Sequence, residues 1–177
     1  MTVNDSKIQA DVQSARDLSM EKGIGHQVYI YVDVAGSQVT STMGKPGSNG
    51  ETTLESYPIK AGFSQIDGAN GKRDANTILI GQAHGHPDTN EAGKETQSAM
   101  STKDQNTSKD LQIAIYGVDA MTGSGRKGSS ANINRANPTG VPTTNNVGKT
   151  SGTGNTGTFN IGRDAMEIWG RSGKPKM

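Results

Sequence analysis

The chain of 177 residues contains no cysteine. Disulfide bonds, thiolate nucleophiles and cysteine-ligated metals are therefore excluded, and histidine and the carboxylates remain as the metal ligands. Without cysteine, the sequence is compatible with reducing and oxidising compartments alike. The formal net charge is only +1, so there is no electrostatic case for binding nucleic acid or an anionic membrane surface.

Long apolar runs are also lacking. Hydrophobic residues make up 30% of the chain, which has 24 glycines. No segment approaches the roughly 20 apolar residues that span a bilayer, and the polar residues 1–20 contain no hydrophobic region of a signal peptide. We therefore expect no membrane span, and either a cytoplasmic location or export that needs no signal peptide. The length suits one domain with a small core and an appended lobe.

Hydrophobic periodicity predicts a short series of elements. Apolar residues at helical spacing follow the start signal Asn4-Asp5-Ser6 and predict a helix over residues 5–20. Residues 122–158 are almost entirely Gly, Ser, Thr, Asn and Pro, which is typical of a long loop or of short hairpins. Runs of β-branched, aromatic and other apolar residues predict strands over residues 28–32, 78–83 and 111–118. Residues 35–37 form a turn signal, and residues 38–42 fit the return strand after it.

Two of the three histidines, His84 and His86, directly follow the apolar run 78–83. On an extended segment, residues i and i+2 point to the same face, so the two imidazoles can bind one metal ion together. Further along the chain, Ser101-x-x-Asp104 offers a carboxylate as a third ligand. Two histidines and one aspartate form a zinc ligand set that leaves a fourth position for water, as catalytic sites require.

The order of these features resembles the bacterial branch of the JAMM (MPN/JAB) metalloprotease family. A helix, an acidic residue, a strand pair, a strand followed by His-x-His-Pro, then Ser-x-x-Asp and a further strand occur in this order between residues 5 and 121. The resemblance implies an α/β (α+β) fold in which a central mixed β-sheet is flanked by helices. Residues 1–121 would form this core, and residues 122–177 a Gly/Asn/Thr-rich extension packed on it.

The resemblance also implies a role for each site residue. His84, His86 and Asp104 would hold Zn²⁺, with a water molecule in the fourth position. Glu21 would act as the general base that takes the proton from this water. Ser101 would donate a hydrogen bond to the oxyanion of the tetrahedral intermediate. The implied reaction is hydrolysis of a peptide or isopeptide bond.

Two features depart from the family pattern. Fourteen residues separate the histidine pair from the Ser-x-x-Asp motif, which is more than the family usually has. Residues 88–100 would therefore form an insertion beside the site, and we expect this insertion to act as a lid or selectivity loop. The match at Glu21 is short, so Glu51 and Glu55 are alternatives for the general base.

Simpler interpretations stay open for several of these residues. The histidine pair can be structural, as part of a surface turn fixed by Pro87. Ser101 fits the N-cap of a helix. Glu21 fits a solvated carboxylate at a helix end, and His26 fits a polar surface or supporting residue better than a metal ligand.

The substrate does not follow from the site residues. The family includes enzymes that cleave isopeptide bonds to ubiquitin-like proteins, enzymes that trim sulfur-carrier proteins, and domains of secreted bacterial toxins. The Gly/Asn/Thr-rich composition suits an exported bacterial protein. We therefore expect an effector domain that acts on protein or peptidoglycan cross-links, with a cognate inhibitor or a secretion protein as partner. The alternatives are a non-catalytic interaction module of the same fold, or a structural, secretion-associated domain.

Overall fold

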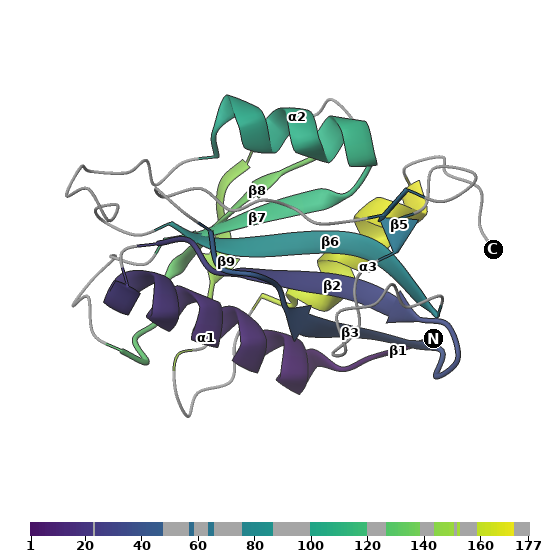
Figure 1. The fold of residues 1–177 in the computed structure, drawn as a ribbon, viewed down its shortest axis with the longest axis horizontal. Helices are drawn as coiled ribbons and strands as arrows, with labels where there is room; N and C mark the ends of the chain where they lie inside the picture. Colours follow the sequence, from purple (N-terminus) through teal and green to yellow (C-terminus); the bar gives the residue numbers. More distant parts are fainter. Residues whose placement is uncertain are drawn as a thin grey trace.

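The computed structural model describes residues 1–22, 24–47, 57–58, 64–65, 76–86, 100–119, 127–138, 144–150, 152 and 159–171. These residues form a curled seven-stranded sheet, in the order β1-β3-β2-β6-β7-β8-β9, and three helices (Figure 1). The β1–β3 and β6–β7 pairs are parallel, and the other neighbouring pairs are antiparallel. The expectation of a mixed sheet flanked by helices is therefore confirmed.

The bounds of the elements are as follows. The sheet contains β1 (Thr2–Val3), β2 (Gln27–Asp33), β3 (Gln38–Met43), β6 (Thr77–His86), β7 (Ala114–Asp119), β8 (Asn132–Ala136) and β9 (Thr144–Lys149). A separate two-stranded pair joins β4 (Tyr57–Pro58) to β5 (Ser64–Gln65). The helices are α1 (Asp5–Lys22), α2 (Thr102–Leu111) and α3 (Ile161–Arg171). Among the described residues, no helix has the length and apolar character needed to cross a membrane.

Helix α1 follows directly from the local sequence. Asn4 precedes it, and the Asn4 Oδ1 atom accepts a hydrogen bond from the Lys7 backbone N–H at 3.4 Å. Ile8, Val12 and Ala15 recur at helical spacing and are at most 2% exposed, and burying a side chain the size of isoleucine or valine contributes roughly 1.5–3 kcal/mol. The helix predicted over residues 5–20 is confirmed, with two further residues at its C-terminal end.

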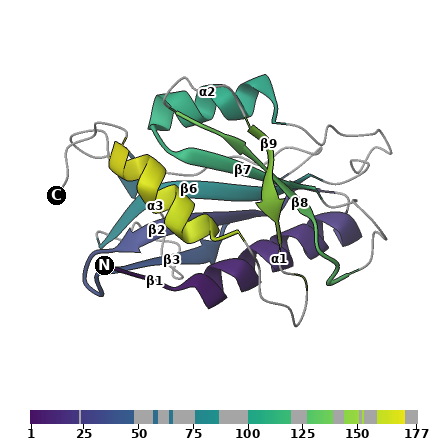
Figure 2. The same ribbon diagram turned by 180° about the vertical axis from the view of Figure 1, so that it is seen from behind.

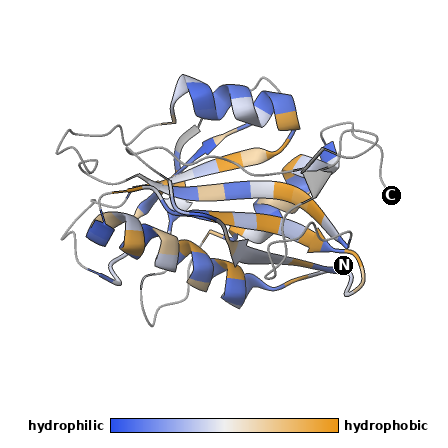
Figure 3. Cartoon of the chain, in the orientation of Figure 1, coloured by the Kyte–Doolittle hydropathy of each residue, from blue (hydrophilic) through white to orange (hydrophobic). Residues whose placement is uncertain are grey.

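The sheet carries an apolar cluster on each face. On the face that we call the α1 face, Val28 and Ile30 of β2 pack with residues of α1 and α3. On the opposite face, the α2 face, Tyr29 of β2 packs with Ile115 of β7 and Leu111 of α2. Figure 2 shows α3 lying across the sheet on the side turned away in Figure 1. Figure 3 shows that α2 is hydrophilic along most of its length, so this helix contributes little to the core.

A β-bulge interrupts β6 before the histidines. Tyr31 of β2 pairs with Leu79, whereas the preceding residue, Ile30, pairs with Gly81. Ile80 is therefore an extra residue on the β6 side. A bulge of this kind shifts the alternation of side chains along the strand by one residue.

This shift decides which way the residues beyond the bulge point. Leu79, before the bulge, belongs to the cluster on the α2 face, and Ala83, beyond it, belongs to the cluster on the α1 face. Because side chains alternate along a strand, Gln82 and His84 point to the α2 face. Without the bulge, His84 would point into the apolar core beneath α1.

The strand predicted over residues 111–118 is shorter in the structure. Leu111 ends α2, Gln112 adopts a left-handed φ of 57°, and β7 begins at Ala114. The apolar Leu111 therefore belongs to the last helical turn, which packs on the α2-face cluster.

The part of the chain beyond residue 122 that the structure describes continues the same sheet. β8 and β9 form an antiparallel pair at its edge, so residues 132–149 contain a hairpin, one of the two possibilities left open by the composition. The Tyr116 hydroxyl donates a hydrogen bond to Asp164 Oδ2 at 2.6 Å, and the Arg135 guanidinium lies 2.7 Å from Asp164 Oδ1. These contacts tie α3 to β7 and β8.

Candidate functional site

His84 and Asp104 meet on the α2 face of the sheet. His84 stands near the end of β6, and Asp104 lies in the first turn of α2. The His84 Nε2 atom is 3.5 Å from Asp104 Oδ1, and the two side chains are only 9% and 17% exposed. The structure therefore brings together two of the three ligands that the sequence predicts, although a segment of almost twenty residues separates them in the chain.

The N-terminus of α2 fixes the position of Asp104. The Ser101 Oγ atom accepts a hydrogen bond from the Asp104 backbone N–H at 3.1 Å, and Asp104 Oδ2 accepts one from the Ser101 backbone N–H at 3.1 Å. This reciprocal pair is a capping box, and its local signature is the Ser-x-x-Asp spacing. One carboxylate oxygen is thus used for capping while the other faces His84.

The charge of Asp104 is set by the same contacts. Burial by itself would raise the pKa of the Asp104 carboxyl. When His84 is protonated, its hydrogen bond and its charge, together with the hydrogen bonds from Ser101, outweigh burial and hold this pKa well below its usual range. Asp104 is therefore an anion at neutral pH, which is the state that a metal ligand needs.

Ser101 is the N-cap of α2. We expect Ser101→Ala to lower the free energy of unfolding by about 1 kcal/mol, because the Asp104 N–H loses its partner. Ser101→Asn is the matched control for stability, since asparagine caps helices about as well as serine. If the hydroxyl also stabilises an oxyanion, Ser101→Ala also loses roughly 10²-fold in turnover. Denaturant unfolding beside kinetics measures the two effects, and unchanged stability in Ser101→Ala would contradict the capping role.

His86 is placed only by its backbone. It is the last residue of β6, and its register partner on β7 is Asp119. Its side chain lies outside the described part of the structure, so its role as a ligand stays a prediction. Within the described residues, no three His, Asp or Glu side chains form a complete metal-binding group.

Asp119 is a buried carboxylate that the sequence did not single out for the site. It ends β7 on the α2 face, is 4% exposed, and accepts a hydrogen bond from Asn134 at 3.3 Å. Burial raises the pKa of Asp119 to about 6, and the hydrogen bond from Asn134 only partly opposes this. A buried carboxylate at the end of the strand beside His86 suits proton transfer near neutral pH. Its position at the end of an apolar strand is the signal that could have revealed it.

The raised pKa of Asp119 has a consequence for stability. In the metal-free protein, the folded state holds this proton more tightly than the unfolded state, so stability falls as the pH rises from about 4 through 6 and is level above. One pKa unit corresponds to about 1.4 kcal/mol. We expect the free energy of unfolding of Asp119→Asn to exceed that of wild type by on the order of 2–3 kcal/mol at pH 8. Urea unfolding with a chelator present measures this difference. Near pH 4 the difference should almost vanish, and a difference that does not vary with pH would contradict this account.

Glu21 lies in the last turn of α1, on the other face of the sheet. Its Oε1 atom is 3.6 Å from Lys127 Nζ, and its side chain is 40% exposed. The last turns of α1 lie against the end of β6. Their close approach is seen at Gly85, where an added side chain would overlap Ser19. Glu21 is thus at the same end of the sheet as His84, but no hydrogen bond or ion pair between these two described residues joins them, and its role stays a prediction. The alternatives Glu51 and Glu55, and the insertion 88–100 except for Met100, lie outside the described residues.

The close approach of α1 explains the glycine between the two histidines. Ser19 is completely buried, and its Oγ atom accepts a hydrogen bond from the His26 backbone N–H at 2.9 Å. The Gly85 backbone N–H donates to the His26 carbonyl at 2.9 Å. The His26 backbone is thereby part of the support for β6.

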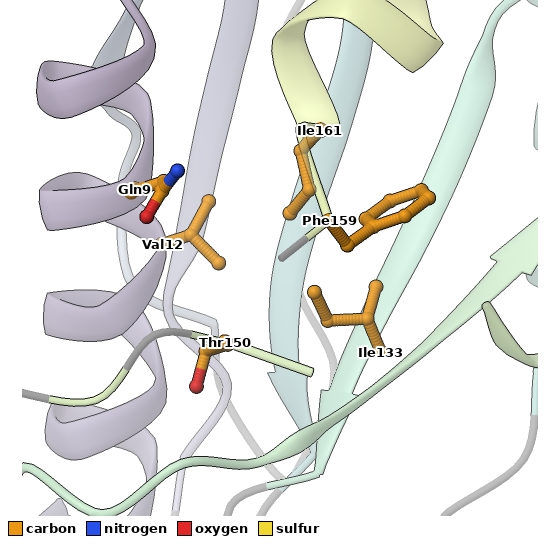
Figure 4. Close-up of a pocket in the computed structure, with 6 residues that line it drawn as sticks. All are labelled: Gln9, Val12, Ile133, Thr150, Phe159 and Ile161. Atoms are coloured by element: carbon orange, nitrogen blue, oxygen red, sulfur yellow. The ribbon is translucent and has the colours of Figure 1, made fainter. Parts of the chain in front are cut away.

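A small apolar crevice, with room for about one water molecule, lies elsewhere in the molecule. Figure 4 shows it between α1 and the start of α3, where Val12, Ile133 and Phe159 line it. Ligand pockets are much larger and include convergent polar groups. The crevice is on the α1 face, so it plays no part in the site around His84.

Comparison of the chain with protein-family models finds no match, and comparison with curated protein sequences finds no match either. Any assignment of function therefore depends on the residues and their geometry.

Proposed function

We propose that the chain is a zinc-dependent amide hydrolase of the JAMM type that cleaves peptide or isopeptide bonds. The observation that carries this proposal is the meeting of His84 and Asp104 on one face of the sheet, 3.5 Å apart. The two residues come from the His-x-His and Ser-x-x-Asp motifs on which the resemblance to the family depends. The mixed sheet with flanking helices is compatible with this proposal.

The separation of the two side chains fits a zinc ion. Zinc binds histidine nitrogen and carboxylate oxygen at about 2.0–2.2 Å in tetrahedral sites, so two of its ligand atoms lie about 3.3–3.6 Å from each other. The distance of 3.5 Å between His84 Nε2 and Asp104 Oδ1 falls in this range. His84, Asp104 and His86 are the residues that would hold the metal.

Each site residue would have its own role in hydrolysis. When bound, zinc would act as a Lewis acid and lower the pKa of a water molecule toward about 7. Asp104 contributes the negative charge that partly balances the cation, and the capping box keeps its second oxygen in place. Glu21 takes up a proton in the role that the resemblance implies, and Ser101 donates to the oxyanion through its hydroxyl hydrogen.

The substrate class follows from composition and family, not from the described geometry. A secreted bacterial effector that cuts a protein isopeptide bond or a peptidoglycan cross-link is the setting that we propose. A cognate inhibitor or a secretion protein is the partner that this setting implies. The alternative is a non-catalytic interaction module of the same fold, and it makes the opposite prediction about metal dependence.

A metal-replacement assay tests the proposal. The purified protein is incubated with a panel of fluorogenic peptides, a lysine-linked isopeptide and a cross-linked muropeptide, before and after removal of metal with a chelator. We expect hydrolysis of at least one amide, its loss on chelation and its recovery on addition of zinc. Zinc binding without hydrolysis of any of these would favour the interaction module.

A further inference from the structure

A chain of buried hydrogen bonds leads from the ring of His84 to a backbone carbonyl. His84 Nδ1 is 2.8 Å from Gln82 Oε1. Gln82 Nε2 donates to Gln27 Oε1 at 3.0 Å, and Gln27 Nε2 donates to the Lys45 carbonyl at 2.9 Å. The chain therefore runs from β6 to β2 and ends just beyond β3.

The last member sets the direction of all the others. A carbonyl oxygen accepts hydrogen bonds and never donates, so Gln27 must present its amide nitrogen to Lys45. The Gln27 side-chain oxygen then faces Gln82, so Gln82 must donate a hydrogen bond to it from its amide nitrogen. Gln82 is left to present its oxygen to His84, and the ring must carry a hydrogen on Nδ1. The Lys45 carbonyl thus selects the state of a ring nitrogen two side chains away.

Burial makes this selection effective. Gln27 is completely buried, and Gln82 and His84 are buried as well. Reversing any one amide would place two acceptors or two donors against each other where little water can compensate. Unsatisfied buried groups of this kind are costly, and hydrogen bonds in chains reinforce each other.

A second acceptor acts on the opposite side of the ring. Asp104 Oδ1 faces His84 Nε2, and a carboxylate by itself attracts a hydrogen onto the nitrogen that it faces. A hydrogen on Nε2 would block the nitrogen that points toward the proposed metal site. The Gln82 oxygen at Nδ1 opposes this effect, because a neutral imidazole carries only one hydrogen.

We propose that Gln27 and Gln82 are positioning residues that hold the hydrogen of His84 on Nδ1 and so reserve Nε2 for the metal. This inference rests on the proposed function for the identity of the metal. The position of the hydrogen on the His84 ring does not depend on that function. Supporting hydrogen bonds to the free nitrogen of a histidine ligand usually come from carboxylates, backbone carbonyls or water. In this protein the side-chain amide of Gln82 accepts this hydrogen bond, and the side-chain amide of Gln27 orients Gln82.

The first test reads the ring of His84 directly in metal-free protein. A ¹H–¹⁵N correlation spectrum of ¹⁵N-histidine-labelled protein, recorded above pH 8, reports which ring nitrogen carries hydrogen. We expect an Nδ1–H signal in wild type, its loss or a shift to Nε2–H in Gln82→Leu, and a weakened signal in Gln27→Leu although residue 27 does not touch the ring. An unprotonated Nδ1 in wild type would overturn the inference without the need for any variant.

The second test measures affinity for zinc by competition with a chelating dye. We expect Gln82→Leu to bind zinc about 10–100-fold more weakly, which is the usual effect of removing an outer partner of a ligand. Gln82→Glu, which keeps an oxygen for Nδ1–H, should retain the Nδ1–H signal. Gln13→Leu is the control, because Gln13 is a buried glutamine of α1 with bonds to Asp17 and Ser129. This control should lose stability without changing zinc affinity.

The outcomes separate the two proposals. Wild type that binds no zinc but shows Nδ1–H contradicts the proposed function and supports the inference about the ring. Wild type that binds zinc with equal affinity in the Gln82→Leu and Gln27→Leu variants leaves the proposed function intact and overturns the role of the two glutamines.

Discussion

The His84→Ala protein is expected to fold and to lose both its bound zinc and its hydrolytic activity. His84 is one of only three protein ligands that the site would supply, and catalytic zinc is commonly held by three. Changes in the outer partners of a ligand already cost about 10–100-fold in affinity, so loss of the ligand itself should cost more. Zinc content after extensive dialysis and hydrolysis under the same conditions measure both effects.

His26→Ala is the matched control for this variant. His26 is also buried, at 9% exposed, and its Nδ1 atom lies 3.0 Å from the Ile24 carbonyl. Loss of this imidazole should lower stability and leave zinc content unchanged. If both histidine variants lost zinc to the same extent, the loss would reflect general disturbance of the fold, and the assignment of His84 would be contradicted.

The Glu21→Gln protein is expected to retain zinc and to lose about 10²–10⁴ in rate, because the substitution keeps the size of the side chain and removes the group that accepts the proton. Its fold should not change, since the ion pair with Lys127 is largely exposed and pairs of this kind contribute little to stability. Steady-state rates with zinc in excess, beside measured zinc content, test this prediction.

A Glu21→Gln protein with nearly full activity would move the role of the base to another carboxylate. Asp119 is the described carboxylate to examine next, because it is buried on the α2 face at the end of the strand beside His86. Asp119→Asn would then show the loss of rate that Glu21→Gln lacked. Equal and small effects from both substitutions would place the base among residues outside the described part of the chain.

Local patterns in the sequence predicted the parts of the fold that depend on local interactions. The spacing of Ile8, Val12 and Ala15 predicted α1. Runs of apolar residues predicted β2 and β6, and the turn that follows β2 predicted β3 as its return strand. Ser101 and Asp104 carry their own signal, because a capping box is formed within four consecutive residues. Helix α2 was not predicted beyond the fit of Ser101 to an N-cap. Its last residue, Leu111, was assigned to the following strand, because it continues an apolar run into β7 and only the left-handed Gln112 separates the two elements.

The orientation of His84 could not be predicted from local patterns. It depends on the extra residue Ile80. The neighbouring Gly81 is a sign of a bulge in the apolar run, but a glycine in a strand does not by itself fix where the register shifts. The bulge arises from the pairing of β6 with β2, which lies far away in the sequence. The same limit applies to Gln27, which reaches the site only through the register of these two strands, and to Asp119, which reaches it through β7.

The zinc content of the purified protein tests the central claim most directly. Elemental analysis of wild type and of the His84→Ala/His86→Ala double variant, purified in parallel without added metal, compares the site with and without its two imidazoles. About one zinc ion per chain in wild type and almost none in the double variant is the result that this account predicts. Unchanged zinc in the double variant, or none in wild type even after zinc is added, would contradict it.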